Sequence, residues 1–149
     1  MSEREKIALA IEFFYEEIIE KYKELEKQVA NESKLSAIFK KIDYKARISR
    51  FKDLKKKVTN MNVKTIAIEK EDDISADLKE KLNKCVNLFG NMIDAQVAMN
   101  MILNKKSDGK KMEIAEYKKT VDALKKANQS MQEGLKELDI IYADKADKE

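Results

Sequence analysis

The sequence predicts an all-α fold, a four-helix bundle built from two long αα-hairpins that an extended linker joins. The chain of 149 residues has the length of one domain, with no proline and only three glycines. Lys, Glu, Ala, Leu and Ile dominate it, and its apolar residues recur every three or four positions over long segments. A β-rich fold needs more turn residues than this chain has. The alternative is a three-helix bundle with an extended arm.

The first helix is predicted over residues about 3–30. Its apolar stripe follows spacings of 4, 3, 4, 4, 3 and 4, and it consists of Ile7, Ile11, Phe14, Ile18, Tyr22, Leu25 and Val29. This period is closer to eleven residues in three turns than to a heptad, so we expect a nearly straight or slightly right-handed helix. Asn31, Glu32 and Ser33 break the pattern, and Ser33 is expected to cap the next helix.

The second helix is predicted over residues about 34–60, and it has two apolar stripes. Leu35, Ile38, Phe39, Ile42 and Ala46 form one, and Tyr44, Ile48, Phe51, Leu54 and Val58 form the other, about half a turn away. The apolar face therefore switches near Asp43. Because no proline or glycine lies nearby, we expect a continuous helix with two contact faces, and the alternative is a kink or break at Asp43.

A linker is predicted over residues about 61–74, where the helical periodicity fails. Val63, Ile66 and Ile68 favour an extended conformation. Two isoleucines in an extended segment are prone to aggregate when they are exposed, so we expect the bundle or another chain to shield them. The length of the linker leaves the bundle topology open.

The third and fourth helices are predicted over residues about 75–106 and 110–143. Asp73 or Ser75 caps the third helix, and Gly109 favours a left-handed turn between the two. From Ile114 the fourth helix has an unbroken heptad stripe, typical of a left-handed coiled coil, while residues 144–149 are expected to fray. Gln96 and Asn128 interrupt the two stripes, and we expect these amides to meet.

Charge is distributed unevenly along the chain. Residues 1–33 contain nine acidic and five basic residues, whereas residues 34–64 contain eleven basic and two acidic ones. The first two helices should therefore attract each other. The basic segment also suggests a phosphate-binding surface, formed by Lys45, Arg50, Lys52, Lys56 and Lys57. A solvated face, or one paired within the chain, explains the same residues more simply.

The composition argues against enzymatic activity. The chain has no histidine and no glycine-rich phosphate loop, which removes the commonest general base and metal ligand and the usual nucleotide cradle. Glu12, Glu16 and Glu20 form an acidic ridge that can in principle hold a hard cation, although a solvated face is the simpler interpretation. Cys85 lies on an apolar stripe and is expected to be buried and inert. We therefore predict no catalytic, cofactor or metal site.

The segment from Cys85 to Asn104 contains a single charged residue, Asp94, although two residues in five are charged in the chain as a whole. We expect Asp94 to pair with a lysine of the second helix or to lie at an edge. The face opposite the core stripe has no lysine or glutamate, and it consists of Asn87, Asn91, Asp94, Ala98 and Met101. Residues 62–73 or another protein chain should cover this face.

The predicted function is a non-enzymatic one that works through protein contacts, as an adaptor, an export or assembly chaperone, or a homo-oligomeric scaffold. The partner is another protein or a second copy of the chain. The alternative is a nucleic-acid-associated protein that uses the basic residues of 34–57. The charged start of the chain and the absence of a long apolar run predict a cytoplasmic protein without membrane association.

Overall fold

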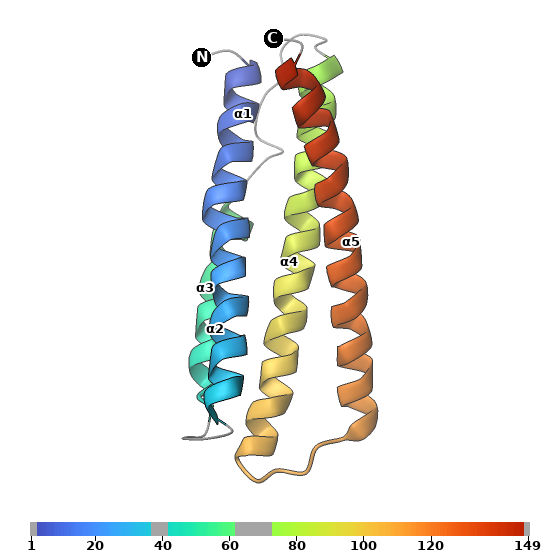
Figure 1. The fold of residues 1–149 in the computed structure, drawn as a ribbon. Helices are drawn as coiled ribbons and strands as arrows, with labels where there is room; N and C mark the ends of the chain where they lie inside the picture. The colour runs from blue at the N-terminus through green and yellow to red at the C-terminus, as the bar shows by residue number, and fades with distance from the viewer. Residues whose placement is uncertain (1–2, 37–41, 62–72, 148–149) are drawn as a thin grey trace.

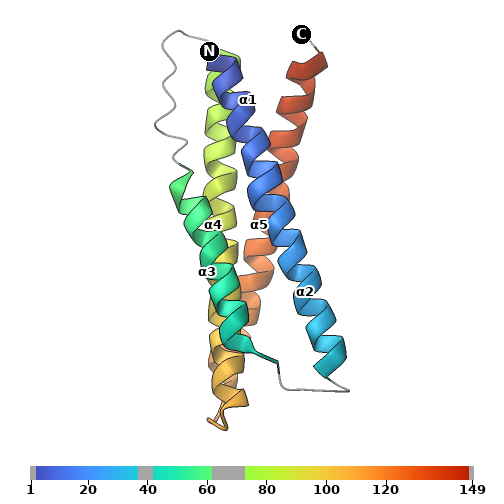
Figure 2. The ribbon, with the colours of Figure 1, turned by 90° about the vertical axis from the view of Figure 1, so that its left-hand side faces the viewer.

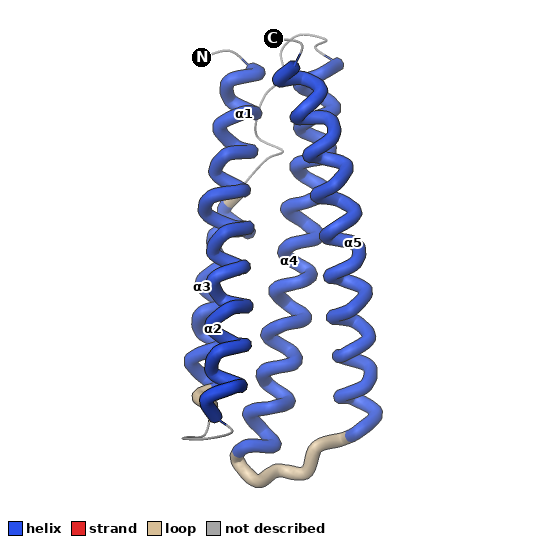
Figure 3. Tube along the Cα trace, viewed as in Figure 1, coloured by secondary structure: helices blue, strands red, loops and turns tan. Residues whose placement is uncertain are grey.

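A computed structural model describes residues 3–36, 42–61 and 73–147, and the described part is an up-and-down bundle of four helical rods (Figures 1 and 3). The first rod is continuous, and three segments make it up: α1 (Glu3–Phe13), the π-helix η1 (Phe14–Ile19) and α2 (Glu20–Ser36). The other rods are α3 (Tyr44–Asn60), α4 (Asp73–Ser107) and α5 (Ile114–Asp147). The described residues contain no strand, in agreement with the predicted all-α class. Figure 2 shows the first rod running obliquely across α4 and α5.

The first rod is longer than predicted, because the helix continues through Asn31, Glu32 and Ser33 to Ser36. Ser33 is not a helix cap. Its hydroxyl donates to the carbonyl oxygen of Val29, 2.8 Å away, which is a bond that serine makes within a continuing helix. The sequence pattern Asn-Glu-Ser was therefore wrongly interpreted as a helix end.

The predicted continuous helix over 34–60 is also wrong, and the break near Asp43 is the alternative that the structure supports. The α3 helix begins at Tyr44, and the Asp43 side chain caps it by accepting the backbone N–H of Ala46 at 3.0 Å. The two apolar stripes therefore belong to separate segments. Residues 37–41 lie outside the described part of the chain.

The π-helical segment explains how the eleven-residue stripe fits a helix that packs on its neighbours. At 100° per residue, the stripe from Ile7 to Val29 drifts by about 40° around an ordinary α-helix. A π-turn takes more residues per turn, and the Glu20 N–H accordingly bonds to the Tyr15 carbonyl, five residues back. Ile18 and Ile19 are both buried in this turn. The π-turn thus keeps the stripe on the core without a right-handed supercoil.

The α4–α5 hairpin is close to its prediction. Gly109 has a φ of 84°, so it occupies the left-handed conformation expected in the turn. The α5 helix begins at Ile114, later than the predicted 110, and continues to Asp147, so 144–147 are helical where we predicted fraying. Most of the predicted linker, about 61–74, and the shielding of Ile66 and Ile68 fall in 62–72, outside the described residues. Its last two residues are helical, because α4 begins at Asp73 and not at the predicted 75.

An aromatic cluster joins three of the rods at the centre of the core. The Phe89 ring of α4 meets the rings of Phe14 and Tyr22 edge to face, with centroids 5.3 and 5.6 Å apart. The ring of Phe51 from α3 lies 6.2 Å from that of Tyr22. Edge-to-face aromatic pairs add specific geometry to apolar burial, so this cluster sets how the first rod and α3 sit on α4.

The polar positions in the stripes do not pair as predicted. The Gln96 side-chain nitrogen donates to the Tyr22 hydroxyl at 3.0 Å, so its partner is on α2 and not Asn128 on α5. The desolvation of Tyr22 raises the pKa of its hydroxyl well above the usual value, which keeps the buried group neutral. Asn128 is half-buried on α5.

Candidate functional site

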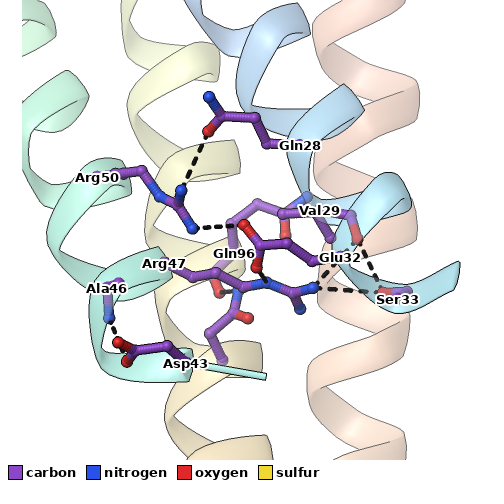
Figure 4. Close-up of polar contacts among 10 residues, drawn as sticks. Gln28, Val29, Glu32, Ser33, Asp43, Ala46, Arg47, Arg50 and Gln96 are labelled. Atoms are coloured by element: carbon purple, nitrogen blue, oxygen red, sulfur yellow. Dashed lines mark hydrogen bonds and ion pairs between the residues drawn. The ribbon is translucent and has the colours of Figure 1, made fainter. Parts of the chain in front are cut away.

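The inner edge of α3 is fastened to α2 by a charged network (Figure 4). The Glu32 carboxylate accepts from the Arg47 Nε at 2.9 Å and from an Arg50 terminal nitrogen at 2.7 Å. Arg47 is only 3% exposed, and it also donates to the Val29 carbonyl and the Ser33 hydroxyl. A buried guanidinium is costly unless its donors are paired, and these bonds pair three of its five N–H groups. The expected attraction between the acidic and basic segments is therefore present, as a fold-forming contact.

The five predicted phosphate-contacting residues divide into two groups. Arg50 binds Glu32, and the Lys57 ammonium lies 3.3 Å from the Glu17 carboxylate, so both are neutralised within the chain. The remaining three are exposed and form no salt bridge with a described side chain: Lys45, Lys52 and Lys56. Of the five predicted residues, only these three leave positive charge open to a partner.

The uncharged face of α4 is open in this chain. Asn87, Asn91, Asp94 and Met101 are exposed and Ala98 is half-buried, so no described element covers the face that we expected to be covered. Residues 62–72, the intramolecular cover that we considered, lie outside the described part. Met101 is 47% exposed, which is high for a large apolar side chain.

Asp94, the one charge on this face, is paired as expected with a lysine of α3. The Lys55 ammonium lies 2.8 Å from its carboxylate and also donates to the Gly90 carbonyl at 3.2 Å. A Cβ on Gly90 would lie 3.1 Å from that ammonium, so the glycine leaves room for the lysine beside α4. The face therefore presents almost no unpaired charge along its length.

A second open surface lies on α5, and the sequence analysis missed it. All residues from 114 to 130 are described, and none of them is buried, although the heptad stripe runs through them. The stripe residues here are only half-buried, and they are Tyr117, Val121, Leu124 and Asn128. In the second half of α5, by contrast, Met131, Gly134 and Leu138 are buried.

The opening follows from how α5 sits against the first rod. The hydroxyl of Tyr15 in η1 donates to the Asp139 carboxylate, which ties the rods together near the end of α5. At the end where the α4–α5 loop lies, α2 and α5 lie apart (Figures 1 and 2). Leu25 and Val29 on α2 are also half-buried, and they pack against the core.

No pattern in the sequence marks this opening. After the π-turn, the stripe of the first rod continues as Tyr22, Leu25 and Val29 with spacings of 3 and 4, the same spacings as in α5. The period of either helix therefore does not predict where the two rods separate.

The acidic and thiol groups do not form a chemical site. Among the described residues, no group of three or more His, Cys, Asp or Glu side chains could hold a metal ion. Within the acidic ridge, Glu20 lies 3.6 Å from the Lys23 ammonium in an exposed pair. Cys85 is 1% exposed, as expected of an inert thiol, and burial raises its pKa to about 11.

None of the helical stretches that the structure describes is long and apolar enough to cross a membrane. No family model matches the chain, and neither the curated proteins nor the solved structures contain a match to it. We therefore infer the function from the exposed surfaces on α4 and α5.

Proposed function

We propose that this protein is a non-enzymatic, cytoplasmic helical bundle that acts through protein contacts, as an adaptor, an export or assembly chaperone, or a scaffold. One observation carries the proposal: the α4 face from Asn87 to Met101 is exposed and nearly free of unpaired charge. Exposed helix faces elsewhere in this chain carry lysine and glutamate. A face without them costs little to desolvate when a partner docks.

The side chains on this face suit a partner surface that adapts. Amide groups can donate and accept hydrogen bonds in several orientations, and the flexible thioether of Met101 fits irregular apolar surfaces. Ala98 lets the backbone of a partner approach closely. The Lys55–Asp94 pair supplies a neutralised polar contact on the face.

The test replaces Asn91 and Ala98 together by glutamate in the full chain. Each carboxylate would have to be desolvated in a contact, so we expect the variant to lose its partner while it keeps its helicity. The matched control is Ala123→Glu with Ser130→Glu, two exposed α5 positions at the same spacing of seven residues.

Proteins that co-purify with the parent chain are identified first, and their affinities for the three versions are then measured with purified components. The proposal predicts at least a tenfold weaker affinity for the α4 variant and an unchanged affinity for the control. Equal binding by all three versions would show that the α4 face is ordinary solvated surface.

A second candidate function is nucleic-acid binding, and the unpaired Lys45, Lys52 and Lys56 favour it. Phosphate contacts release counterions, so such binding should weaken steeply between low and moderate salt. Replacing Lys52 and Lys56 by glutamate should then abolish it. Nucleic-acid binding that does not depend on salt concentration, or that persists after Lys52 and Lys56 are replaced, rules this candidate out.

A further inference from the structure

We infer that the open half of α5 is a self-association surface, on which two copies of the chain pack their residues 114–128 against each other as antiparallel helices. This surface is separate from the α4 face, so the inference does not depend on the proposed function. Its starting point is the half-buried heptad stripe, which in a single chain has no complete cover.

The period of the stripe decides what kind of partner fits it. A seven-residue repeat packs best on a helix with the same repeat, because both then follow the same left-handed supercoil. The nearby α2 lies apart from this half of α5 (Figures 1 and 2), so it does not cover the stripe. A second α5 has the required repeat by definition, so a second copy is the occupant that we assign.

The stripe is also complementary to itself in the antiparallel direction. A two-fold axis between Val121 and Leu124 places each of these residues opposite the other in the second copy. The same axis places Tyr117 opposite Asn128, so the two polar members of the stripe meet. A hydroxyl and an amide that face each other can form a hydrogen bond, whereas a parallel pairing would oppose like residues.

Two lysines lie at the border of the stripe, and in the antiparallel pair they need an acidic counterpart. Lys118 and Lys125 precede Asp139 by multiples of seven residues, so they lie on the edge of α5 that meets the first rod through Tyr15. Neither lysine forms a salt bridge with a described side chain. In the pair of chains, these lysines of one copy approach the α2 helix of the other.

The acidic counterpart on α2 is Glu26. It is exposed and makes no salt bridge with a described side chain; desolvation raises the pKa of its carboxyl group, and the nearby charge of Lys23 opposes this rise. A lysine from the second copy would compensate this desolvated carboxylate and relieve the repulsion between the lysines of the two α5 helices.

The first experiment measures molecular mass by analytical ultracentrifugation of the full chain over a wide range of concentrations. We expect a monomer that becomes a dimer as the concentration rises. Leu124→Glu should remove the dimer, whereas Ala123→Glu, at the adjacent exposed position, should keep it. A chain that is monomeric throughout, or a dimer that survives Leu124→Glu, would overturn the inference.

The second experiment tests the antiparallel arrangement by disulfide cross-linking in a Cys85→Ala background. Val121→Cys and Leu124→Cys chains should cross-link efficiently when they are mixed, and poorly when each is alone. Circular dichroism confirms that each variant keeps its helicity. Efficient cross-linking within each single variant, with no gain on mixing, would contradict the antiparallel register.

Discussion

The two halves of α5 carry the same apolar stripe but have different surroundings. Residues 131–141 include three buried positions, and the Gly134 backbone lies close to α4: a Cβ there would come within 2.7 Å of the Leu88 side chain. Residues 114–130 have no buried position, and Ile114 is 68% exposed. A periodic stripe thus predicts that a helix forms and which face is apolar, but the neighbouring helices determine whether that face is covered.

The neighbours differ because the first rod and α5 meet at one level only. At that level, Tyr15 and Asp139 are hydrogen-bonded, and the ring of Phe14, next to Tyr15, packs edge to face on Phe89 of α4. Farther along α2 the two rods lie apart (Figures 1 and 2), and the apolar stripe of α5 is only half-buried there. The buried side chains of residues 131–141 contribute stability, and the half-buried stripe of residues 114–130 is available to a second copy of the chain.

The largest expected effect comes from truncating one leucine in each half. Leu138 is fully buried, so Leu138→Ala should lower the free energy of unfolding by about 3 kcal/mol, because it leaves a cavity. Leu124→Ala should cost about 1 kcal/mol when the chain is dilute and monomeric, since water can occupy the space. Urea unfolding of both variants measures the two losses of unfolding free energy. Equal losses would contradict the difference between the two halves of α5.

A methyl group added at Gly134 should destabilise the protein, because residues 131–141 are closely packed against α4. The added Cβ would overlap the Leu88 side chain, at a cost of about 2 kcal/mol, and the better helix propensity of alanine offsets about 1 kcal/mol of this. Gly134→Ala should therefore lower the stability by about 1 kcal/mol. Combining it with Leu88→Ala should cost less than the sum of the single changes. An additive result would show that the two sites do not touch.

Two acids near the end of α5 should give pH dependences of opposite sign. A hydrogen bond from Lys84 lowers the pKa of Glu137, so its stabilising contribution is present above the ordinary value of 4.5 and is lost as the pH falls through the lowered pKa. Burial raises the pKa of Asp139 above its ordinary 3.8, so its contribution is fully present below that value and is lost as the pH rises through the raised pKa.

Urea unfolding between about pH 3 and pH 7 distinguishes the two groups. Glu137→Gln should reduce the loss of unfolding free energy that occurs as the pH falls toward 3. Asp139→Asn should reduce the loss of unfolding free energy that occurs as the pH rises above about 4. The exposure of both groups keeps these effects small. If both variants change the pH dependence of the unfolding free energy in the same direction, the environment of one acid has been misassigned.

The sequence predicted the features that depend on local chemistry. Gly109 forms the left-handed turn, Cys85 is buried, and Asp94 pairs with a lysine of the preceding helix. Errors arose where two local signals competed. Ser33 resembled a cap but bonds within a continuing helix, and Asp43 caps α3 in a segment without proline or glycine.

The open half of α5 depends on tertiary structure, so the α5 stripe considered alone could not reveal it. Val121 and Leu138 belong to the same heptad pattern, and only the path of the first rod distinguishes their environments. The predicted contact face on α4 lies on the surface, with Asn87, Asn91 and Asp94 exposed. The π-turn was also missed, because the stripe it corrects is compatible with a gently supercoiled helix.

Hydrogen exchange along α5, measured at low and high protein concentration, tests the central claim most directly. The account predicts that amides of 131–141 are protected at both concentrations, because the core holds them. Amides of 114–130 should exchange much faster in the dilute protein and become protected in the concentrated protein, as second copies cover the stripe. Equal protection of both halves at every concentration would contradict the account.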